Sequence, residues 1–410
     1  MNKSLNNFCI AILSPFLLIA PSHAQDNEGE EPVTATIEGH VFKPVKRKAT
    51  DERVAQLKVP AGFRIQKFAE DLGNTRMMAI NTDGTLYVTR REQGDVLMLK
   101  DTNGDGKADV KQTVAKQEDM HGITIHEGKV YLATVKQLYV TDIKQDGMLG
   151  ELQKIGEELP DGGQHPNRTL RFGPDGKLYI SIGSTCNACE ETNPEHATLL
   201  QANADGTNRK VYAKGLRNTF GFDWHPQSRQ LWGMDHGIDW LGDEAQREEL
   251  NLIEEGEDYG WPYVYEDGKS VPHRSPDDKS HSEKAAESKF PVLTHDAHSS
   301  GMGMLFYTGT QFPAEYRNNA FVVFRGSWNR SNPVGYKLAR VKYDANGQPT
   351  AFEDFLTGFL IEEGRAHIGR PVSVAQHPDG SLFLCDDSNG MINRISYTTG
   401  IQQGQKRRKN

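Results

Sequence analysis

The stretch Gly173-Pro174-Asp175-Gly176-Lys177-Leu178-Tyr179-Ile180 decides the fold, because a tight turn leads directly into β-forming residues. Pro and Asp-Gly favour a reversal of the chain, and Leu, Tyr and Ile favour an extended strand after it. We therefore expect these residues to form the turn and the following strand of a hairpin.

The same pattern recurs along the chain. Turn residues precede a short strand-like run at 81–88, 127–132, 173–180, 225–232, 318–323 and 377–384, at intervals of about 45 to 90 residues. Small sheets that bury their faces only against their neighbours are typical of a β-propeller. A β-sandwich is the alternative, although its strands usually follow one another at shorter spacing.

Six repeats predict an all-β protein with a six-bladed β-propeller over residues 55–398. The wide gap between the fourth and fifth repeats predicts a loop insertion between blades four and five, at about residues 238–300. Residues 60–70 precede the first repeat, and we expect them to supply a strand that closes the ring with the last blade.

Composition excludes several other classes. The 410 residues include 40 Gly and 19 Pro, too many helix breakers for a long helical bundle. They also include 17 Phe, 13 Tyr and 5 Trp, too many aromatic residues for a disordered chain. The formal net charge of -9 argues against nucleic acid as a partner, because phosphate binding needs a basic face.

The N-terminal segment predicts export. Residues 1–24 contain one Lys, an apolar run and small residues before Gln25, a pattern typical of a signal peptide. A membrane anchor is the alternative. With the signal removed, we expect a periplasmic or secreted protein without stable membrane insertion, with an exposed leader at 25–54 and a basic tail at 399–410.

Two closely spaced cysteines remain after export, Cys186 and Cys189. Thiols in an oxidising compartment more often form a disulfide than a metal site, so we expect a local disulfide here. Haem attachment would need His at position 190, where the chain has Glu190.

Several polar loops carry candidate functional residues. His165 lies on a Gly-rich loop, where an imidazole can move protons near neutral pH. Arg217 and Asn218 offer fixed donors for a carboxylate or a sugar hydroxyl. Each of these residues could instead be an ordinary surface or paired side chain of a blade edge.

Other loops suggest ion binding. The segment Asp235–Asp239 offers oxygen ligands suited to Ca²⁺, or is simply part of an acidic surface. Arg325, Arg330 and Arg370 lie beside strands of different repeats and could together bind a polyanion. A D-x-N-x-D-G pattern places possible Ca²⁺ ligands at Asp101, Asn103, Asp105 and Asp109, although the same residues could form a plain polar loop.

Taken together, these motifs resemble a known family. The run His165–Gly176, the pair Arg217-Asn218, the loop from His236 to Asn251 and Arg370 before Pro378-Asp379-Gly380 resemble the glucose/sorbosone dehydrogenase family. These are soluble quinoproteins on a six-bladed propeller, which use pyrroloquinoline quinone and Ca²⁺ to oxidise sugars. Gln164 departs from the glucose enzymes, which have Asp beside the base.

The resemblance implies a role for each of these residues. His165 would be the general base for a sugar hydroxyl, while hydride passes from the same carbon to the quinone. Arg217 and Asn218 would hold the cofactor and polarise its carbonyl, which makes Arg217 a catalytic residue as well. Arg370 with Arg325 or Arg330 would pair with the cofactor carboxylates. The main-chain carbonyls of Gly237 and Ile238 would bind Ca²⁺.

The expected function is therefore oxidation of an aldose or sugar aldehyde, with electrons passed on to an external acceptor. Two alternatives stay open. One is a Ca²⁺-dependent propeller hydrolase similar to a lactonase, and the other is a binding propeller without catalytic activity.

Overall fold

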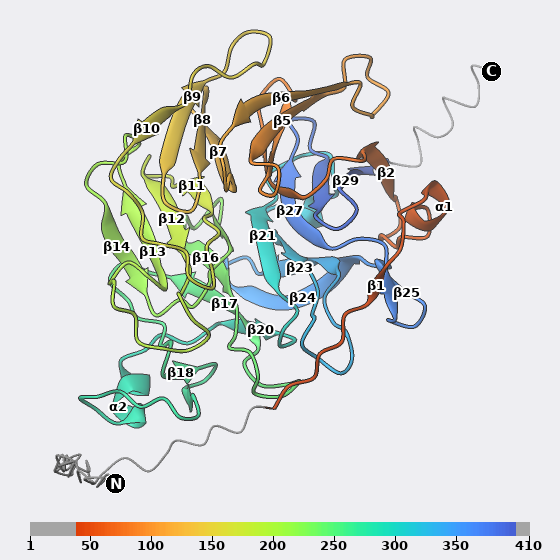
Figure 1. Ribbon diagram of the computed structural model, residues 1–410. Coiled ribbons are helices and arrows are strands. Elements are labelled where there is room, and N and C mark those ends of the chain that lie inside the picture. The colour runs from red at the N-terminus through yellow and green to blue at the C-terminus, as the bar shows by residue number, and fades with distance from the viewer. Residues whose placement is uncertain (1–37, 399–410) are drawn as a thin grey trace, which may run out of the picture. The chain divides into compact units, whose positions relative to one another are not determined.

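Six four-stranded antiparallel sheets form most of residues 38–398, the part of the chain that this computed structural model describes (Figure 1). The all-β architecture expected from the sequence is confirmed. The expected signal peptide, the leader up to residue 37 and the basic tail lie outside the described residues. No helix among residues 38–398 is long and apolar enough to cross a membrane.

In each sheet, consecutive strands of the chain pair with one another, except where β20 (Leu293–His295) and β2 (Phe63–Ala69) supply the last strand. The first contains β3 (Thr75–Ile80), β4 (Leu86–Arg90), β5 (Asp95–Lys100) and β6 (Val110–Lys116). The second contains β7 (Gly122–His126), β8 (Lys129–Ala133), β9 (Leu138–Asp142) and β10 (Gln153–Ile155). The third contains β11 (Leu170–Phe172), β12 (Leu178–Ile182), β13 (Thr198–Ala202) and β14 (Lys210–Lys214).

The other three sheets have the same four-stranded form. The fourth contains β15 (Gly221–Trp224), β16 (Leu231–Asp235), β17 (Glu248–Ile253) and β20 (Leu293–His295). The fifth contains β21 (Gly301–Phe306), β22 (Ala320–Phe324), β23 (Lys337–Tyr343) and β24 (Pro349–Leu356). The sixth contains β27 (Pro371–Gln376), β28 (Leu382–Asp386), β29 (Met391–Tyr397) and β2 (Phe63–Ala69).

The smaller elements lie outside these sheets. Three short strands, β1 (Val45–Lys46), β26 (Ala366–His367) and β25 (Leu360–Ile361), form one small sheet, and β18 (Val264–Tyr265) pairs with β19 (Lys269–Ser270). The helices are α1 (Asp51–Val54), α2 (His281–Ala286) and the 3₁₀ turn η1 (Ala314–Tyr316).

The repeated turns of the sequence occupy the same position in all six sheets. Each of the six turns connects the first and second strands of one sheet, as between β11 and β12. The expected strand before the first repeat is also confirmed, because β2 pairs with β29 in the sixth sheet. N-terminal and C-terminal residues thus share one sheet, which fixes the ends of the array to each other.

The first strands of the six sheets lie around a common centre. Strand β3 packs against β7 and β27, β7 packs against β11, and β21 packs against β15 and β27. Residues from all six first strands line a single internal cavity of about 420 Å³. The core between sheets is strongly aromatic: Phe63 of β2 makes edge contacts with Phe312 and Phe355, at centroid distances of 4.7 and 4.9 Å.

One expected boundary was wrong, and one expected segment is only partly exposed. The proposed insertion at 238–300 contains β17 and β20, which are strands of the fourth sheet, so the added segment is 254–292, between the third and fourth strands of that sheet. The described part of the expected leader is exposed at residues such as Val41 and Val45, but it is also anchored on the fold. Strand β1 pairs with β26, and Ala49 and Val54 are buried, because apolar residues in this short segment complete the hydrophobic core.

Candidate active site

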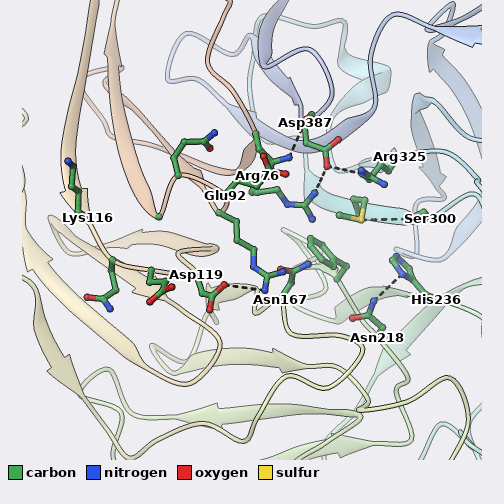
Figure 2. Close-up of a pocket in the computed structure, with 18 residues that line it drawn as sticks. Arg76, Glu92, Lys116, Asp119, Asn167, Asn218, His236, Ser300, Arg325 and Asp387 are labelled. Atoms are coloured by element: carbon green, nitrogen blue, oxygen red, sulfur yellow. Dashed lines mark hydrogen bonds and ion pairs between the residues drawn. The ribbon is translucent and has the colours of Figure 1, made fainter. Parts of the chain in front are cut away.

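A cavity of about 1080 Å³ opens beside the starts of the first strands (Figure 2). Its cationic lining residues are Arg76, Arg91, Lys116 and Arg325, which come from the first and fifth sheets and the turns beside their strands. Asn167, Asn218 and His236 add further polar groups, and Glu92, Glu118 and Asp119 add carboxylates. The cavity therefore offers several donors to an anionic or polyhydroxylated ligand.

Asp387 joins two of these arginines. Its Oδ2 accepts a hydrogen bond from Arg76 and lies 2.8 Å from Nε of Arg325 (Figure 2). Burial alone would raise the pKa of Asp387, but the charges of Arg325 and Arg76 hold this pKa below its ordinary value. One carboxylate thus faces two guanidinium groups, which leaves excess positive charge on this wall of the cavity.

Arg370 lies behind that wall and does not line the cavity. Its guanidinium donates to the carbonyls of Arg325 and Gly326 and lies over the ring of Tyr336, 5.4 Å from the centroid. Burial and the nearby charge of Arg325 lower the pKa of Arg370 to about 10. Arg370 therefore fixes the loop that carries Arg325.

Arg330 has a different environment from Arg325 and Arg370. It donates to the carbonyls of Asp243 and Ala297, at 2.6 and 3.1 Å, and to Glu244. The side chain is buried and is not part of the cavity wall. Of the three arginines expected to bind a polyanion, only Arg325 reaches the cavity.

His165 is held at its Nδ1 atom. Nδ1 lies 3.0 Å from the carbonyl oxygen of Ser184 and 2.9 Å from the Ser184 hydroxyl. Burial lowers the pKa of His165 to about 2, and the charges of Arg217 and His236 add to this effect. The imidazole is therefore neutral throughout the physiological range, so it can accept a proton without first losing one.

Gly183 brings His165 and Asn218 together. A Cβ atom at Gly183 would lie 2.4 Å from Cβ of His165 and 2.8 Å from Oδ1 of Asn218. Any larger residue would push these side chains apart. The end of β12 thus places the histidine next to a residue that lines the cavity.

Asp235 accepts several hydrogen bonds from the turn that contains Arg217 and Asn218. Its carboxylate accepts from the backbone N–H groups of Arg217 and Asn218 and from the hydroxyl of Thr219, at 3.0, 2.8 and 2.9 Å. Burial raises the pKa of Asp235 to about 6. The Asn218 amide in turn contacts Nδ1 of His236 at 3.1 Å, which orients both groups at the cavity wall.

Arg217 itself does not line the cavity, although the sequence predicted that it would hold the cofactor. Its Nε donates to the carbonyl of Asn187, and its Nη2 donates to Oδ1 of Asn187, both at 2.9 Å. Nη2 also lies 3.3 Å from a carboxylate oxygen of Asp239. Burial lowers the pKa of Arg217, and the charges of Asp239 and Asp235 oppose that effect.

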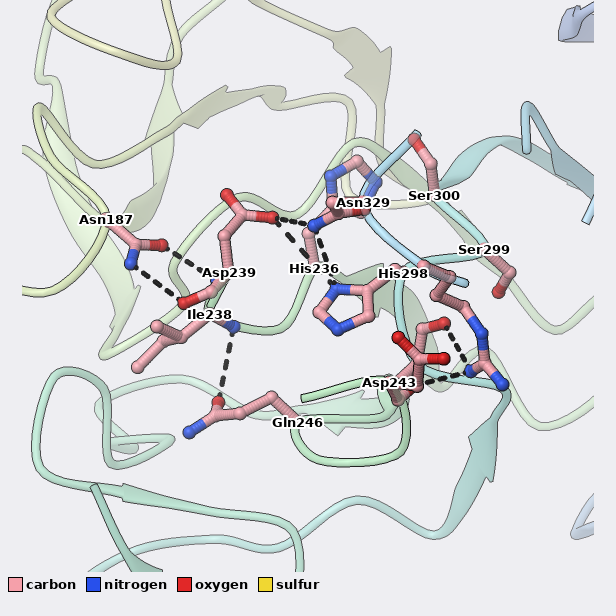
Figure 3. A network of polar contacts seen from close by, with 12 residues as sticks. Asn187, His236, Ile238, Asp239, Asp243, Gln246, His298, Ser299, Ser300 and Asn329 are labelled. Atoms are coloured by element: carbon pink, nitrogen blue, oxygen red, sulfur yellow. Dashed lines mark hydrogen bonds and ion pairs between the residues drawn. The ribbon is translucent and has the colours of Figure 1, made fainter. Parts of the chain in front are cut away.

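The loop after β16 carries the two residues expected to bind Ca²⁺ through their carbonyls. The amide of Ile238 lies 3.3 Å from the side-chain oxygen of Gln246 (Figure 3). A Cβ atom at Gly237 would lie 2.1 Å from the carbonyl oxygen of Gln246, so only Gly fits there. No hydrogen bond from any of residues 38–398 reaches the carbonyl oxygens of Gly237 and Ile238.

The other candidate Ca²⁺ loop has a different organisation. The carboxylate of Asp101 accepts from the backbone N–H groups of Gly104 and Gly106, and Asp109 accepts from Thr102. Asn103 and Asp105 likewise accept from backbone N–H groups two residues ahead. These side chains close an exposed turn, and within the described chain they do not form a cluster of three carboxylates around one point.

Cys186 and Cys189 form a disulfide, with Cα atoms 6.1 Å apart. The nearby carboxylate of Glu191 completes a group of possible metal ligands with these two sulfurs. Because both sulfurs are bonded to each other, neither is a thiolate that could bind a metal.

Four residues of this region were not predicted from the sequence: Arg76, Arg91, Asp387 and Asn187. A charged residue in an otherwise apolar strand, as Arg76 is in Thr75–Ile80, is the signal that could have pointed to the first of them. The other three lie in turns where polar residues are common, so only the folded chain shows their partners.

Comparison with known proteins agrees with this arrangement. The family model described as TrAA12-like matches residues 57–398. The chain belongs to the TrAA12-like family. The relationship to quinone-dependent sugar dehydrogenases expected from the sequence motifs is thereby confirmed.

This TrAA12-like chain also matches individual proteins. An uncharacterized protein of Borreliella burgdorferi is 30% identical over 366 residues, which are 85% of this chain and 93% of the relative. Aldose sugar dehydrogenase YliI of Escherichia coli is 24% identical over 57% of this chain and 60% of its own length. The pyrroloquinoline quinone-dependent pyranose dehydrogenase of Coprinopsis cinerea is 30% identical over only 27% of this chain and 17% of its own.

Solved structures show the same fold. The family AA12 enzyme of Trichoderma reesei has a TM-score of 0.74 at 20% identity, covering 84% of this chain and 98% of that one. The holo form of the pyranose dehydrogenase quinone domain from Coprinopsis cinerea has a TM-score of 0.71 at 20% identity, covering 87% and 100%. At this level of identity, the likeness establishes the fold of the TrAA12-like chain and not its activity.

Proposed function

We propose that this protein is a quinone-dependent sugar oxidoreductase that oxidises an aldose or sugar aldehyde. The observation that carries the proposal is a neutral histidine, His165, beside a cavity whose lining includes the Arg76 and Arg325 guanidinium groups and the Asn218 amide. Relatives whose names give pyrroloquinoline quinone or aldose sugars as ligands support the same conclusion. Membership of the TrAA12-like family, whose model matches residues 57–398, also supports the proposal.

The residues present fit pyrroloquinoline quinone and Ca²⁺. A tricarboxylate needs cationic partners, and Arg76 and Arg325 outnumber the single Asp387 between them. A hard cation prefers oxygen ligands, and the carbonyls of Gly237 and Ile238 accept no hydrogen bond from the described residues. We therefore assign the quinone to the cavity, held by Arg325 and Asn218, and Ca²⁺ to the two carbonyls.

When bound, the quinone would supply a two-electron acceptor for hydride from the sugar carbon, with Ca²⁺ as a Lewis acid beside it. The protein would supply the base and the positioning. Ser184 fixes Nδ1 of His165, so that Nε2 takes the proton of the sugar hydroxyl. Arg217 and Arg370 would act on the cofactor through the loops that they hold.

The six sheets are best described as the six blades of a propeller. Their first strands surround one internal cavity, and the cavity with the candidate site lies next to the starts of several of these strands. Sites at one mouth of the axis are usual in propellers, because loops from different blades converge there.

We further propose that residues 1–24 direct export and that the protein acts in the periplasm or outside the cell. The Cys186–Cys189 disulfide supports this location, because such bonds persist in oxidising compartments. An external electron acceptor is then required to reoxidise the cofactor.

Purified protein mixed with pyrroloquinoline quinone and Ca²⁺ provides the test. We expect saturable quinone binding and dye-linked oxidation of aldoses, both reduced when Ca²⁺ is chelated. Failure to bind quinone at micromolar concentration would overturn the proposal and favour a binding propeller. Hydrolysis of lactones without added quinone would favour the hydrolase instead.

A further inference from the structure

Asn187 lies between the two cysteines of the disulfide and contacts two segments of the candidate site. Figure 3 shows its contacts with Asp239. Its side-chain oxygen accepts from Nη2 of Arg217 and from the backbone N–H of Asp239, both at 2.9 Å. Its side-chain NH₂ donates to the carbonyl of Asp239 at 3.1 Å. Its own carbonyl accepts from Nε of Arg217 at 2.9 Å and from the indole of Trp261 at 3.3 Å.

Through these contacts, the Asn187 side chain forms hydrogen bonds with both the backbone N–H and the backbone carbonyl of Asp239. Asp239 directly follows Gly237 and Ile238, whose carbonyls we assign to Ca²⁺. The Asp239 carboxylate also accepts from Asn329 at 2.6 Å, so this loop is held from two sides. The orientation of the preceding carbonyls therefore depends on where Asn187 lies.

The disulfide loop is itself anchored. The carbonyl of Cys186 accepts from the Ser184 hydroxyl at 2.7 Å, and the same Ser184 contacts Nδ1 of His165. Cys186 and Ala188 pack against a buried cluster that includes Ile238 and Trp261. The short loop thus lies between the proposed base and the proposed Ca²⁺ ligands.

We propose that Asn187, fixed by the Cys186–Cys189 disulfide, is a positioning residue that sets the Gly237–Asp239 loop for binding of Ca²⁺ and the quinone. This inference rests on the proposed function for its ligand. An amide is required at this position, because one side chain must both accept from Arg217 and donate to the carbonyl of Asp239. Asp would lose the donor, and Ala would lose both.

The first experiment uses the protein without cofactor. Amide hydrogen exchange of residues 236–243 is compared in the wild type, Asn187→Ala and Asn193→Ala. Asn193 is a matched control, since its side chain lies in the same segment and accepts only from the backbone of Glu195. We expect exchange to be about tenfold faster in Asn187→Ala alone, as expected when a buried hydrogen bond is lost.

The second experiment adds Ca²⁺ and pyrroloquinoline quinone. We expect Asn187→Ala to bind the quinone about tenfold more weakly at a fixed Ca²⁺ concentration, and higher Ca²⁺ to restore binding. A variant that was merely unfolded would not recover in this way. If Asn187→Ala does not fold, Asn187→Asp retains an acceptor for Arg217 and is still expected to speed exchange.

The outcomes separate the two proposals. Unchanged exchange at residues 236–243 in these variants would overturn the role of Asn187. Wild-type protein that binds no quinone would overturn the proposed function, while the exchange rates would still decide whether Asn187 positions the loop.

Discussion

Nδ1 of His165 and the carbonyl oxygen of Ser184 lie 3.0 Å apart, and this contact determines which nitrogen of the ring can act as a base. A carbonyl oxygen only accepts, so Nδ1 carries the proton and Nε2 retains its lone pair. The backbone at the end of β12 thus selects the tautomer that proton abstraction requires.

Replacing His165 with Gln should reduce sugar oxidation at least about a hundredfold, because a positioned base contributes that much or more. Quinone affinity should change little, since His165 is not assigned to the cofactor. Turnover with a dye acceptor and an absorbance titration of quinone measure the two effects. The neighbouring Gln164→Ala should retain most activity, because the Gln164 side chain is exposed and makes no side-chain hydrogen bond to the described residues. Equal losses in both variants would contradict the assignment.

The dependence of kcat/KM on pH should lack an acidic limb that comes from His165. An ordinary His is protonated below that value and could not act as a base, whereas burial lowers the pKa of His165 to about 2. His165 should therefore remain neutral in the free protein down to about pH 4. Initial rates between pH 4 and 8 provide the measurement, and a decline centred on pH 6.5 that disappears in His165→Gln would refute it.

Arg325 and Arg330, five residues apart, should respond differently to truncation. Arg325→Ala removes a cation from the cavity wall, so quinone should bind about tenfold or more weakly. Arg330→Ala removes three contacts to buried or loop groups, so the free energy of unfolding should fall by about 2 kcal/mol. Titration with quinone measures the change in binding, and unfolding in denaturant measures the change in stability, for both variants. Weaker binding confined to Arg330→Ala would reverse the roles.

Replacing Glu249 with Gln should stabilise the protein at alkaline pH. Burial, together with the charge of Asp235, raises the pKa of Glu249 to about 8 from its usual value of 4.5. A carboxyl group with a raised pKa costs stability as the pH rises from 4.5 through 8, because the unfolded chain is then the more readily ionised form. We expect a gain on the order of a few kcal/mol at pH 8.5 and no gain at pH 4.5. Denaturant unfolding of both proteins at the two pH values measures the difference in the free energy of unfolding. An equal difference at both pH values would show that ionisation of Glu249 is not its cause.

Removing the disulfide through the double variant Cys186→Ser, Cys189→Ser should lower the free energy of unfolding by about 2 kcal/mol, the value expected for so short a loop. Treatment of the wild type with a dithiol should give the same shift, because the dithiol is oxidised as the bond is reduced to two thiols. Cys385 is buried and should not contribute. Identical unfolding curves before and after reduction would contradict the prediction.

The local patterns of the sequence determined the sheets. Each turn such as Gly173–Gly176 specifies its own hairpin, because turn residues and β-forming residues act over a few neighbours. The same reasoning identified His165, Asn218 and Arg325, which lie in or beside the cavity. Boundaries were less accurate: β17 and β20 belong to one sheet although about 40 residues separate them, and local patterning does not report pairing over that distance.

Only the tertiary structure decided which polar residues meet. Asp387 pairs with Arg76 from more than 300 residues away, and Asn187 reaches Arg217 and Asp239 from another sheet. The sequence indicated cationic residues suited to an anion, but it could not show that Arg330 and Arg370 are held by carbonyl groups while Arg325 faces the cavity. That difference depends on burial and on the direction of each side chain, which are set when the sheets pack around their common centre.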